Sequence, residues 1–264
     1  AHVLRCFEDD DITHVDGRID PMSDFETIET ELMLSDLESL EKRKGGLEKK
    51  IKQKDADALQ TMRLIETAIA VLEDGKPART AEIDEDDAKA WRMLQLLTSK
   101  PVLYVANVDE ESAATGNAFS DKVVAHAESE GAQSVIISAQ IESEMALLDD
   151  EEQAEYLGAI GLEEPGLNRL IRKGYALLGL QTYFTVGPKE ARAWTFHKGW
   201  TAPKCAGVIH GDFEKGFIRA ETTAYEDYVE HNGEQGAKEA GKVRQEGKEY
   251  IVKDGDIMLF KFNV

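Results

Sequence analysis

The chain has 264 residues, 42% of them hydrophobic and 31% charged, and its formal net charge at pH 7 is −21. This length suits one large domain or two to three small ones, each with its own core. No apolar run approaches the roughly 20 residues that span a membrane, so we expect no membrane partner. Two distant cysteines, Cys6 and Cys205, favour reduced thiols in a cytoplasmic protein over a disulfide or a zinc site.

The charge is unevenly distributed along the chain. Residues 181–264 hold 12 Lys/Arg against 13 Asp/Glu, which leaves a net charge of −20 on residues 1–180. A nearly neutral C-terminal region can still present a local basic face to RNA, whereas the acidic remainder should repel polyanions. The six histidines show no spacing typical of metal ligands. We therefore expect neither a metal site nor a DNA partner.

The first residues look like a strand that is already under way. Residues 1–7 are largely apolar and begin with Ala1, where a natural chain usually begins with Met. We therefore expect a fragment of a longer protein, and we see no signal peptide. A helical pattern follows the loop that ends near Pro21, with Ser23 or Asp24 as the expected N-cap.

Residues 24–74 are predicted to form an antiparallel helical hairpin. Its two apolar seams have spacings of three and four residues and consist of Phe25, Ile28 and Leu32, then Met62, Ile65, Ile69 and Leu72. We read the charged segment 41–46 as the crossing between the arms, with Gly45-Gly46 as a possible break in the first arm. The seams are explained by packing within the hairpin, although a protruding hairpin could also dock onto a large partner.

Helices and strands alternate after the hairpin. A helix over 84–97, a strand over 101–106, a helix over 119–130 and a strand over 134–137 are expected in that order. Together with the first strand, this order predicts an α/β fold with a parallel sheet and an inserted helical hairpin. Residues 141–180 are expected to continue as helices.

The character of the sequence changes after Gly179. Expected elements are strands over 182–186 and 191–196 joined at Gly187-Pro188, a helix over 203–210, and strands over 216–220 and 256–262. This mixture predicts that residues 181–264 form a separate small α+β domain.

Asn107 and Glu110 follow the apolar strand 101–106 directly. Ligands of α/β sheets bind beyond the carboxyl ends of the strands, and these two side chains can pair with the edge of a base. Guanine-specific enzymes commonly carry Asn-Lys-x-Asp here, whereas this chain has Val108 in place of the lysine and Glu110 in place of the aspartate. The alternative is an ordinary loop at a strand end, since Asn-x-x-Glu by itself is common there. The chain contains no G-x-x-x-x-G-K-[ST] phosphate loop, the usual companion of a base-reading loop.

Three further residues are candidates for the same base site. Ser138 and Ala139 follow the strand 134–137 and could offer backbone N–H groups to a base; otherwise they simply end the strand. Phe7 could wall a base pocket or belong to the core. The acids at 8–11 resemble a metal cluster, but a solvated acidic loop is the favoured interpretation.

Basic residues of the C-terminal region alternate with glycine and apolar residues, in a pattern that can approach phosphates closely. They lie at Lys215 to Arg219, and at Lys238, Lys242, Arg244 and Lys248. Interleaved glutamates allow an equally good interpretation as ordinary loop charge.

Several long stretches together resemble one family, the YchF or Obg-like ATPases. They are residues 5–9 (Arg-Cys-Phe-Glu-Asp), 106–110 (Ala-Asn-Val-Asp-Glu), 163–169, 180–185, 212–220 and 233–242. The resemblance runs through essentially the whole chain, and the C-terminal matches are highly specific.

The resemblance implies a P-loop protein of the translation-factor GTPase class. Residues 1–23 and 98–180 would form an incomplete GTPase-like nucleotide-binding domain, residues 24–97 an inserted coiled-coil domain, and residues 181–264 a β-grasp-like TGS domain. Family members are similar to GTPases but prefer ATP, with weaker use of GTP. Their TGS domain and helical hairpin are associated with binding of the ribosome or ribosomal RNA.

The resemblance also implies which residues read the base. Asn107 would hydrogen-bond adenine and the Val108 backbone would contact it. Phe7 would line the pocket, with Ser138 and Ala139 beside it. The P-loop, the switches and the Mg²⁺-binding hydroxyls belong to a segment that would precede Ala1. No catalytic residue is therefore carried over, and the chain alone is expected to be an inactive part of an ATP hydrolase.

Two other functions are compatible with the residues alone. The chain could bind ribosome or RNA as a module that needs no nucleotide, or it could regulate other proteins through its acidic first 180 residues. A nucleotide domain without its first strands should also expose a sheet edge, so we expect poor solubility or self-association.

Overall fold

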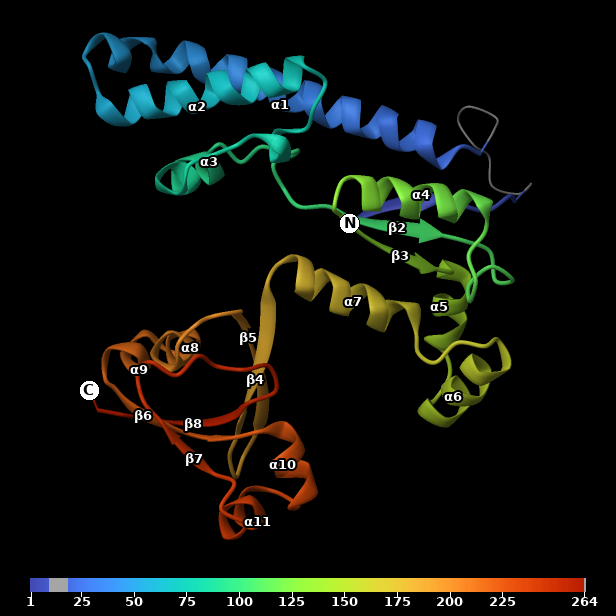
Figure 1. The fold of residues 1–264 in the computed structure, drawn as a ribbon, viewed down its shortest axis with the longest axis vertical. Coiled ribbons are helices and arrows are strands. Elements are labelled where there is room, and N and C mark those ends of the chain that lie inside the picture. The colour runs from blue at the N-terminus through green and yellow to red at the C-terminus, as the bar shows by residue number, and fades with distance from the viewer. Residues whose placement is uncertain (10–18, 264) are drawn as a thin grey trace. The chain divides into compact units, whose positions relative to one another are not determined.

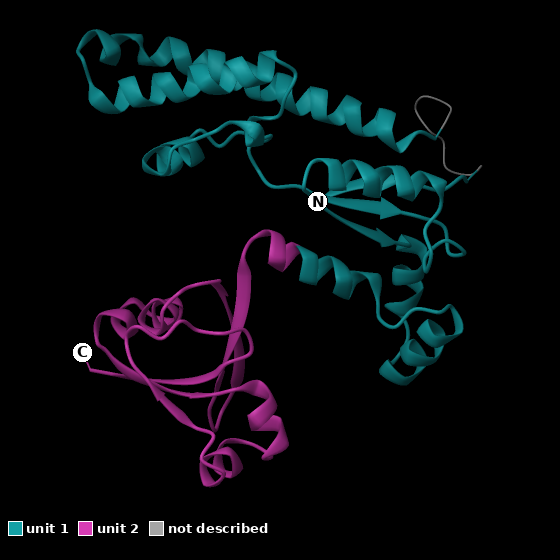
Figure 2. Ribbon diagram, viewed as in Figure 1, with its two compact units in different colours: residues 1–173 teal, residues 174–264 magenta. Residues whose placement is uncertain are grey.

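The computed structural model describes residues 1–9 and 19–263, which form two compact units, residues 1–173 and 174–264 (Figure 2). The first unit contains a parallel sheet and a helical hairpin, and the second contains a mixed sheet with short helices (Figure 1). None of the helices in the described part of the chain has the length and apolarity needed to traverse a bilayer.

The first unit is built on three parallel strands in the order β1 (His2–Arg5), β2 (Leu103–Asn107) and β3 (Gln133–Ile137). The central strand β2 is buried from Leu103 to Ala106, as its unbroken apolar run predicts. Helix α4 (Ala118–Ser129) packs on β2 and β3. The parallel direction agrees with the expectation from the sequence, which did not specify the spatial order of the strands.

The helical hairpin consists of α1 (Pro21–Lys52) and α2 (Ala56–Glu73), which lie antiparallel and are joined by a short turn (Figure 1). Three predictions about it are wrong. The crossing between the arms lies at residues 53–55 and not at 41–46, which belong to α1. The N-cap is Asp20, whose carboxylate accepts hydrogen bonds from the first turn, rather than Ser23 or Asp24. Helix α1 also runs unbroken through Gly45-Gly46, because packing on α2 outweighs the roughly 1 kcal/mol that each glycine costs.

The chain returns to the sheet through the 3₁₀ turns η1 (Ala78–Thr80) and η2 (Glu85–Asp87) and the short helix α3 (Ala88–Met93). This helix is shorter than the predicted 84–97. The 3₁₀ turn η2 takes up its expected start, and at its end Gln95 adopts the left-handed region at φ 55°. The buried carboxylate of Asp36 on α1 holds the segment that leads back to the sheet. It accepts hydrogen bonds from the backbone N–H of Leu97 at 2.7 Å and from the N–H and Oγ1 of Thr98 at 2.8 and 2.7 Å.

Three helices follow β3, as expected. They are α5 (Ala139–Met145), α6 (Asp150–Ala159) and α7 (Gly166–Leu177). Helix α7 is anchored by Glu142, whose carboxylate accepts hydrogen bonds from the first two N–H groups of that helix at 2.7 and 3.1 Å. Such a carboxylate at a helix N-terminus satisfies orphan donors and complements the helix dipole.

The second unit is a five-stranded sheet in the order β5-β4-β8-β6-β7, in which only β4 and β8 pair in parallel. The strands are β4 (Leu180–Val186), β5 (Ala191–His197), β6 (Phe217–Thr223), β7 (Arg244–Glu246) and β8 (Ile257–Phe262). Helix α8 (Ala202–Ile209) closes a core around Tyr183, Phe196 and Met258. The predicted strands and turn at Gly187 are present.

Three short helices and strand β7 in this unit were not predicted. The helices are α9 (Gly211–Lys215), α10 (Tyr225–Glu230) and α11 (Glu234–Glu239). Each helix has only five or six residues, which is too short for a hydrophobic period to show in the sequence. Lys238 therefore lies on a helix rather than in a glycine-rich loop.

Candidate base-binding site

The carboxyl ends of β1, β2 and β3 meet at one edge of the parallel sheet, where they border a cleft of about 750 Å³. This volume lies in the range of ligand sites of small molecules, roughly 300–1,000 Å³. The cleft is lined by Phe7, Glu8, Asp9, Asn107, Val108, Asp109, Glu110, Glu111, Ala139 and Gln140. Five of the six residues predicted to read a base therefore converge on one cleft, although they come from three separate segments.

Asn107 is held at the centre of the cleft by hydrogen bonds. Its side-chain Oδ1 accepts a hydrogen bond from the backbone N–H of Ala139 at 2.9 Å. Its backbone oxygen accepts one from the N–H of Cys6 at 2.7 Å. The side-chain oxygen is thus occupied, and the Nδ2 group remains as the donor that Asn107 can offer to a ligand.

Phe7 lies half-buried at the end of β1, and Arg5 fixes it there. The Arg5 guanidinium carbon lies 4.9 Å from the centroid of the Phe7 ring, within cation–π range. Arg5 Nε also donates to the Phe7 carbonyl at 3.2 Å, and its terminal nitrogen donates to the Asp9 carbonyl at 3.0 Å. Phe7 therefore forms a wall of the cleft instead of joining the core, and sequence reasoning did not identify Arg5.

The other predicted residues differ in what they can contact. Ser138 is only 2% exposed and does not line the cleft, and its hydroxyl has no hydrogen-bond partner in the described residues. The backbone N–H of Val108 donates to the Ile137 carbonyl at 2.9 Å, and the residue is only 2% exposed and packs in the core, although it borders the cleft. Glu110 is exposed at the mouth of the cleft.

The electrostatic character of the cleft is strongly acidic. Glu8, Asp9, Asp109, Glu110 and Glu111 line it, and no lysine or arginine does so within the described residues. Of the acidic stretch 8–11, Asp10 and Asp11 lie outside the described residues. Such a lining repels the phosphates of a nucleotide but accepts the N–H groups of a base.

Asn117 supports the cleft from behind and was not singled out from the sequence. It caps α4 through a capping box with Ser120, and its Nδ2 donates to the Cys6 carbonyl at 2.7 Å. The Asn-x-x-Ser spacing before a helix is a signal that could have revealed it. Burial raises the pKa of the neighbouring Cys6 thiol to about 12, so this thiol is protonated and unreactive at neutral pH.

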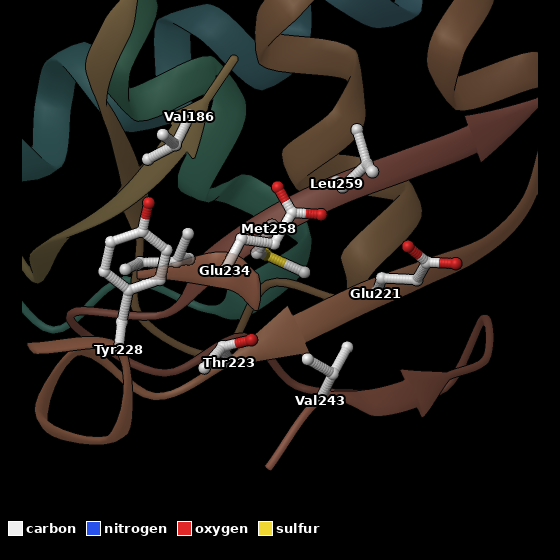
Figure 3. Close-up of a pocket in the computed structure, with 9 residues that line it drawn as sticks. Val186, Glu221, Thr223, Tyr228, Glu234, Val243, Met258 and Leu259 are labelled. Atoms are coloured by element: carbon white, nitrogen blue, oxygen red, sulfur yellow. The ribbon is translucent and has the colours of Figure 1, made fainter. Parts of the chain in front are cut away.

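A second cavity, in the second unit, is much smaller than the cleft. Its volume is about 30 Å³, room for one or two water molecules but not for a base. Aliphatic side chains of β4 and β8 and the Tyr228 ring line it, with Glu221 and Glu234 among the polar residues (Figure 3).

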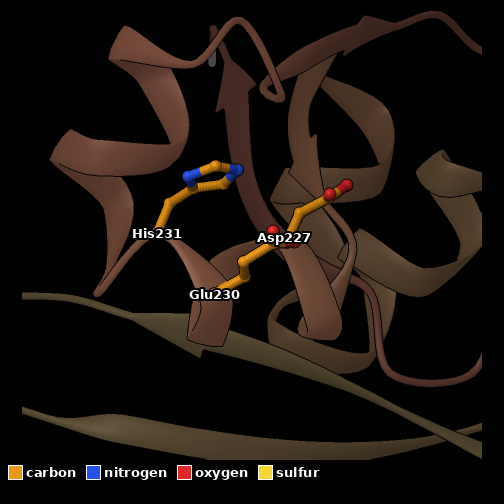
Figure 4. Close-up of side chains that lie close together, drawn as sticks. All are labelled: Asp227, Glu230 and His231. Carbon is orange, nitrogen blue, oxygen red and sulfur yellow. The ribbon is translucent and has the colours of Figure 1, made fainter.

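Asp227, Glu230 and His231 bring potential metal-ligand atoms within 4.8 Å of one another on and beside α10 (Figure 4). The sequence did not suggest this group. Lys242 Nζ already lies 2.9 Å from Asp227 Oδ1, and this ion pair raises the pKa of Lys242. An ion pair explains the position of Asp227 without a metal ion.

Comparison with known proteins places the chain in a family. A family model called YchF-GTPase_C, described as a protein of unknown function (DUF933), matches residues 180–263. The whole chain is 55% identical to the ribosome-binding ATPase YchF of Haemophilus influenzae and covers 72% of that protein. It is 52% identical to the protein of the same name from Bacillus subtilis, of which it covers 73%.

A solved structure supports the same assignment. The structure of the Schizosaccharomyces pombe YchF GTPase matches 98% of this chain and 71% of that chain, with a TM-score of 0.80 and 33% sequence identity. The resemblance seen in the sequence is thus confirmed by relatives that match the whole chain and by a similar fold. The chain belongs to the YchF family.

Proposed function

We propose that this chain is the base-reading and ribosome-binding part of an ATP-hydrolysing protein. In this proposal residues 1–23 and 98–180 form part of the nucleotide-binding domain, residues 24–97 an inserted coiled-coil domain, and residues 181–264 a β-grasp-like TGS domain. The observation that carries the proposal is the hydrogen bond from the Ala139 N–H to Asn107 Oδ1 at 2.9 Å, at the centre of a cleft of suitable size.

That hydrogen bond favours adenine over guanine. The carbonyl oxygen O6 of guanine needs a donor, and the Ala139 N–H next to it is already engaged by Asn107. Adenine carries an amino group at the same position, which needs an acceptor, and Asp109 and Glu110 supply carboxylates around the cleft. Asn107 Nδ2 would then donate to a ring nitrogen, while Phe7 stacks on the base.

The acidic lining suggests how a bound nucleotide is oriented. A triphosphate carries several negative charges and would be repelled by the five carboxylates of the cleft. The base would therefore enter the cleft and the phosphates would point away from it. Residues outside this sequence would hold the phosphates and Mg²⁺, since the sequence contains no P-loop motif.

Hydrolysis is accordingly proposed for the parent protein and not for residues 1–264 alone. Phosphoryl transfer depends on positioning and on charge stabilisation around the phosphates. No residue of the cleft is assigned such a role. The names of the bacterial relatives, which describe ribosome-binding ATPases, support both ATP hydrolysis and the ribosome as a partner.

The base-reading proposal is tested with nucleosides, which lack the phosphates that this chain is not expected to hold. Adenosine and guanosine are titrated into the 264-residue chain, and binding is followed by NMR shifts of the cleft residues. We expect adenosine to bind more tightly than guanosine. Asn107→Ala should weaken adenosine binding about tenfold, the effect of losing one hydrogen bond of about 1.4 kcal/mol.

A matched control makes the same chemical change elsewhere. Asn168 is exposed on α7, and Asn168→Ala should leave adenosine binding unchanged. Equal affinities for adenosine and guanosine, or an Asn107→Ala variant that binds adenosine like the unmodified chain, would contradict the proposal. ATP turnover by the 264-residue chain would contradict its second part.

A further inference from the structure

Gln140 borders the cleft directly after Ala139, whose backbone N–H is hydrogen-bonded to Asn107 Oδ1 at 2.9 Å. It lies in the first turn of α5 and is exposed. A glutamine amide has an acceptor oxygen and a donor nitrogen, and these two ends select opposite groups on a base. The contacts that hold the amide therefore decide which group the cleft can recognise.

Glu144 fixes the direction of this amide. Gln140 Nε2 donates to Glu144 Oε1 at 2.8 Å, one helical turn farther along α5. An ionised carboxylate only accepts hydrogen bonds, so it bonds the amide nitrogen and not the amide oxygen. Gln140 Oε1 has no hydrogen-bond partner among the described residues. Gln140 therefore keeps a free acceptor at the border of the cleft.

Glu144 is itself held from a second helix. The Tyr156 hydroxyl of α6 donates to Glu144 Oε2 at 2.9 Å, so each oxygen of the carboxylate has its own donor. The hydrogen bonds from Gln140 and then from Tyr156 lower the pKa of Glu144, which is therefore ionised at neutral pH. The hydrogen bond to Glu144 raises the pKa of Tyr156, which therefore remains a donor.

Packing between α5 and α6 keeps the three polar side chains in place. The buried cluster of Ile141, Met145 and Leu157 joins the two helices, and the Tyr156 ring packs against it. Figure 1 shows α5 and α6 next to each other beyond the end of β3. Because the ring is held by apolar contacts, its hydroxyl keeps Glu144 in one position.

Support of the helix alone does not explain this arrangement. A matching pair occurs on α11, where Gln235 Nε2 donates to Glu239 Oε1 at 2.6 Å. Such pairs four residues apart contribute little to helix stability. The α11 pair does not border the cleft, and Glu239 has no second donor among the described residues. Only the pair at Gln140 joins a held carboxylate to the candidate base site.

We propose that Gln140 Oε1 accepts a hydrogen bond from the amino group at position 6 of adenine and is a specificity-determining residue. The inference rests on the proposed function, in which Ala139 and Asn107 face position 6 of the base. Glu144 and Tyr156 are positioning residues. A fixed acceptor also disfavours guanine and hypoxanthine, because their carbonyl oxygen at position 6 would meet another oxygen.

Two carboxylates of the cleft are less suited to this selection. Asp109 Oδ1 already accepts a hydrogen bond from the backbone N–H of Ser112 at 2.8 Å, and Glu110 is exposed at the mouth of the cleft. A solvated carboxylate accepts from any N–H group, whereas the held amide of Gln140 offers one oxygen. The carboxylates thus attract N–H groups in general, and Gln140 distinguishes the group at position 6.

The test uses nucleosides that differ at position 6. Adenosine carries an amino group there, purine riboside a hydrogen atom and inosine a carbonyl oxygen. Their affinities are measured by NMR titration for the 264-residue chain and three variants. Gln140→Met removes the acceptor but keeps the side-chain length and helix propensity, and Gln235→Met makes the same change in the matching pair on α11. Glu144→Gln leaves Gln140 intact but lets its amide turn.

The unmodified chain should bind adenosine about fivefold more tightly than purine riboside, the effect of one hydrogen bond. Gln140→Met should remove this difference by weakening adenosine binding alone, and Gln235→Met should retain it. Glu144→Gln should raise the affinity for inosine several-fold relative to adenosine, because the amide nitrogen of Gln140 can then donate to the carbonyl oxygen. A purely structural role of Glu144 would instead weaken all three nucleosides equally.

Two results would overturn the role of Gln140. One is a ratio of adenosine to purine riboside affinity that Gln140→Met leaves unchanged, and the other is an equal loss of this ratio in Gln235→Met. An unchanged ratio of inosine to adenosine affinity in Glu144→Gln would overturn the positioning role. If Asn107→Ala weakens adenosine binding while Gln140→Met does not, the base site stands and only this inference fails. If the unmodified chain binds guanosine as well as adenosine, the proposed function fails and this inference fails with it.

Discussion

The two sheets of this chain place their polar residues in different ways. In the first unit, three parallel strands end at one edge, where polar loops border a cleft of about 750 Å³. In the second unit, a mixed sheet closes around a core in which Tyr183 is 0% and Phe196 1% exposed, and its cavity of about 30 Å³ holds no base. Parallel connections collect the loops that follow successive strands at one edge, whereas antiparallel connections distribute them over both.

The comparison indicates that the first unit mainly provides binding surfaces and that the second unit mainly provides a stable core. In the first unit, β1 is an edge strand among the described residues, the cleft is acidic, and residues 42–54 of the hairpin are basic. The second unit has a continuous aromatic core and a net charge near zero, with 12 basic and 13 acidic residues in 181–264. We therefore expect substitutions in the second core to change stability without changing the base site, and the predictions below test this separation.

The largest effect is expected for Phe196→Ala. This ring packs at 5.8 Å from Tyr183, measured between centroids, and it is almost completely buried. Removing such a side chain typically costs about 3–5 kcal/mol of the free energy of unfolding. Urea denaturation should show the loss, and adenosine binding in the cleft should persist at low urea. If Phe196→Ala abolished adenosine binding as well as destabilising the second unit, the stability of the second unit and the base site of the first would not be independent.

Asp36→Ala should produce a similar but smaller loss, confined to the first unit. Removing this carboxylate leaves the backbone N–H groups of Leu97 and Thr98 without their partner, at a cost of about 3 kcal/mol. Hydrogen exchange should accelerate in α1 and in the return segment before β2. Asp36→Asn, which keeps an acceptor oxygen, serves as the control and should lose less. Unchanged exchange in α1 would show that Asp36 does not fasten the hairpin.

Self-association is expected to depend on the open edge of the parallel sheet. Val3 on the edge strand β1 is 61% exposed, and an unpaired edge can add a strand from another molecule. Val3→Lys should lower the association constant several-fold in sedimentation velocity, because lysine disfavours edge pairing. Val208→Lys, on an accessible helix position in the second unit, is the matched control. A monodisperse monomer at all concentrations would contradict this expectation.

The smallest effect concerns His2 and pH. Burial lowers the pKa of His2 below its usual 6.5, and Glu29 opposes this shift. The unfolded chain therefore takes up the proton first as pH falls. The contribution of neutral His2 to stability is present above pH 6.5 and declines as pH falls from there towards its folded pKa. His2→Gln should make the stability of the first unit depend less steeply on pH between 7 and 5.5; an unchanged slope would contradict the assignment.

Much of the fold could be predicted from the sequence, because long helices and strands show a clear periodicity of apolar residues. Strand β2 is a buried apolar run, and α2 carries the predicted seam residues Ile65, Ile69 and Leu72 on its buried face. The N-cap was assigned wrongly even though Asp20-Pro21 combines two start signals, a capping carboxylate and a proline at the first helical position. Helices α10 and α11 were missed because elements of six residues contain fewer than two helical turns, so the hydrophobic period does not repeat.

The candidate site was predicted as a set of residues but not as a geometry. Asn107 and Ala139 could be chosen because each follows a predicted parallel strand. Their hydrogen bond joins residues 32 apart in the sequence and depends on the register in which Asn107 pairs with Ile137. Ser138 was grouped with them because it ends the same strand, but its side chain is buried away from the cleft.

The sequence by itself determined the order of the elements, the parallel sheet with its inserted hairpin, the positions of Asn107 and Phe7 at strand ends, and the family. These depend on local pattern and on matching stretches of residues. Only the tertiary structure decided that the Ala139 N–H bonds to Asn107 Oδ1, that Arg5 holds Phe7 against the cleft, and that the basic segment 42–54 lies at the end of the hairpin. The physical reason is that each of these features depends on how separate segments meet in space, or on where one long helix ends.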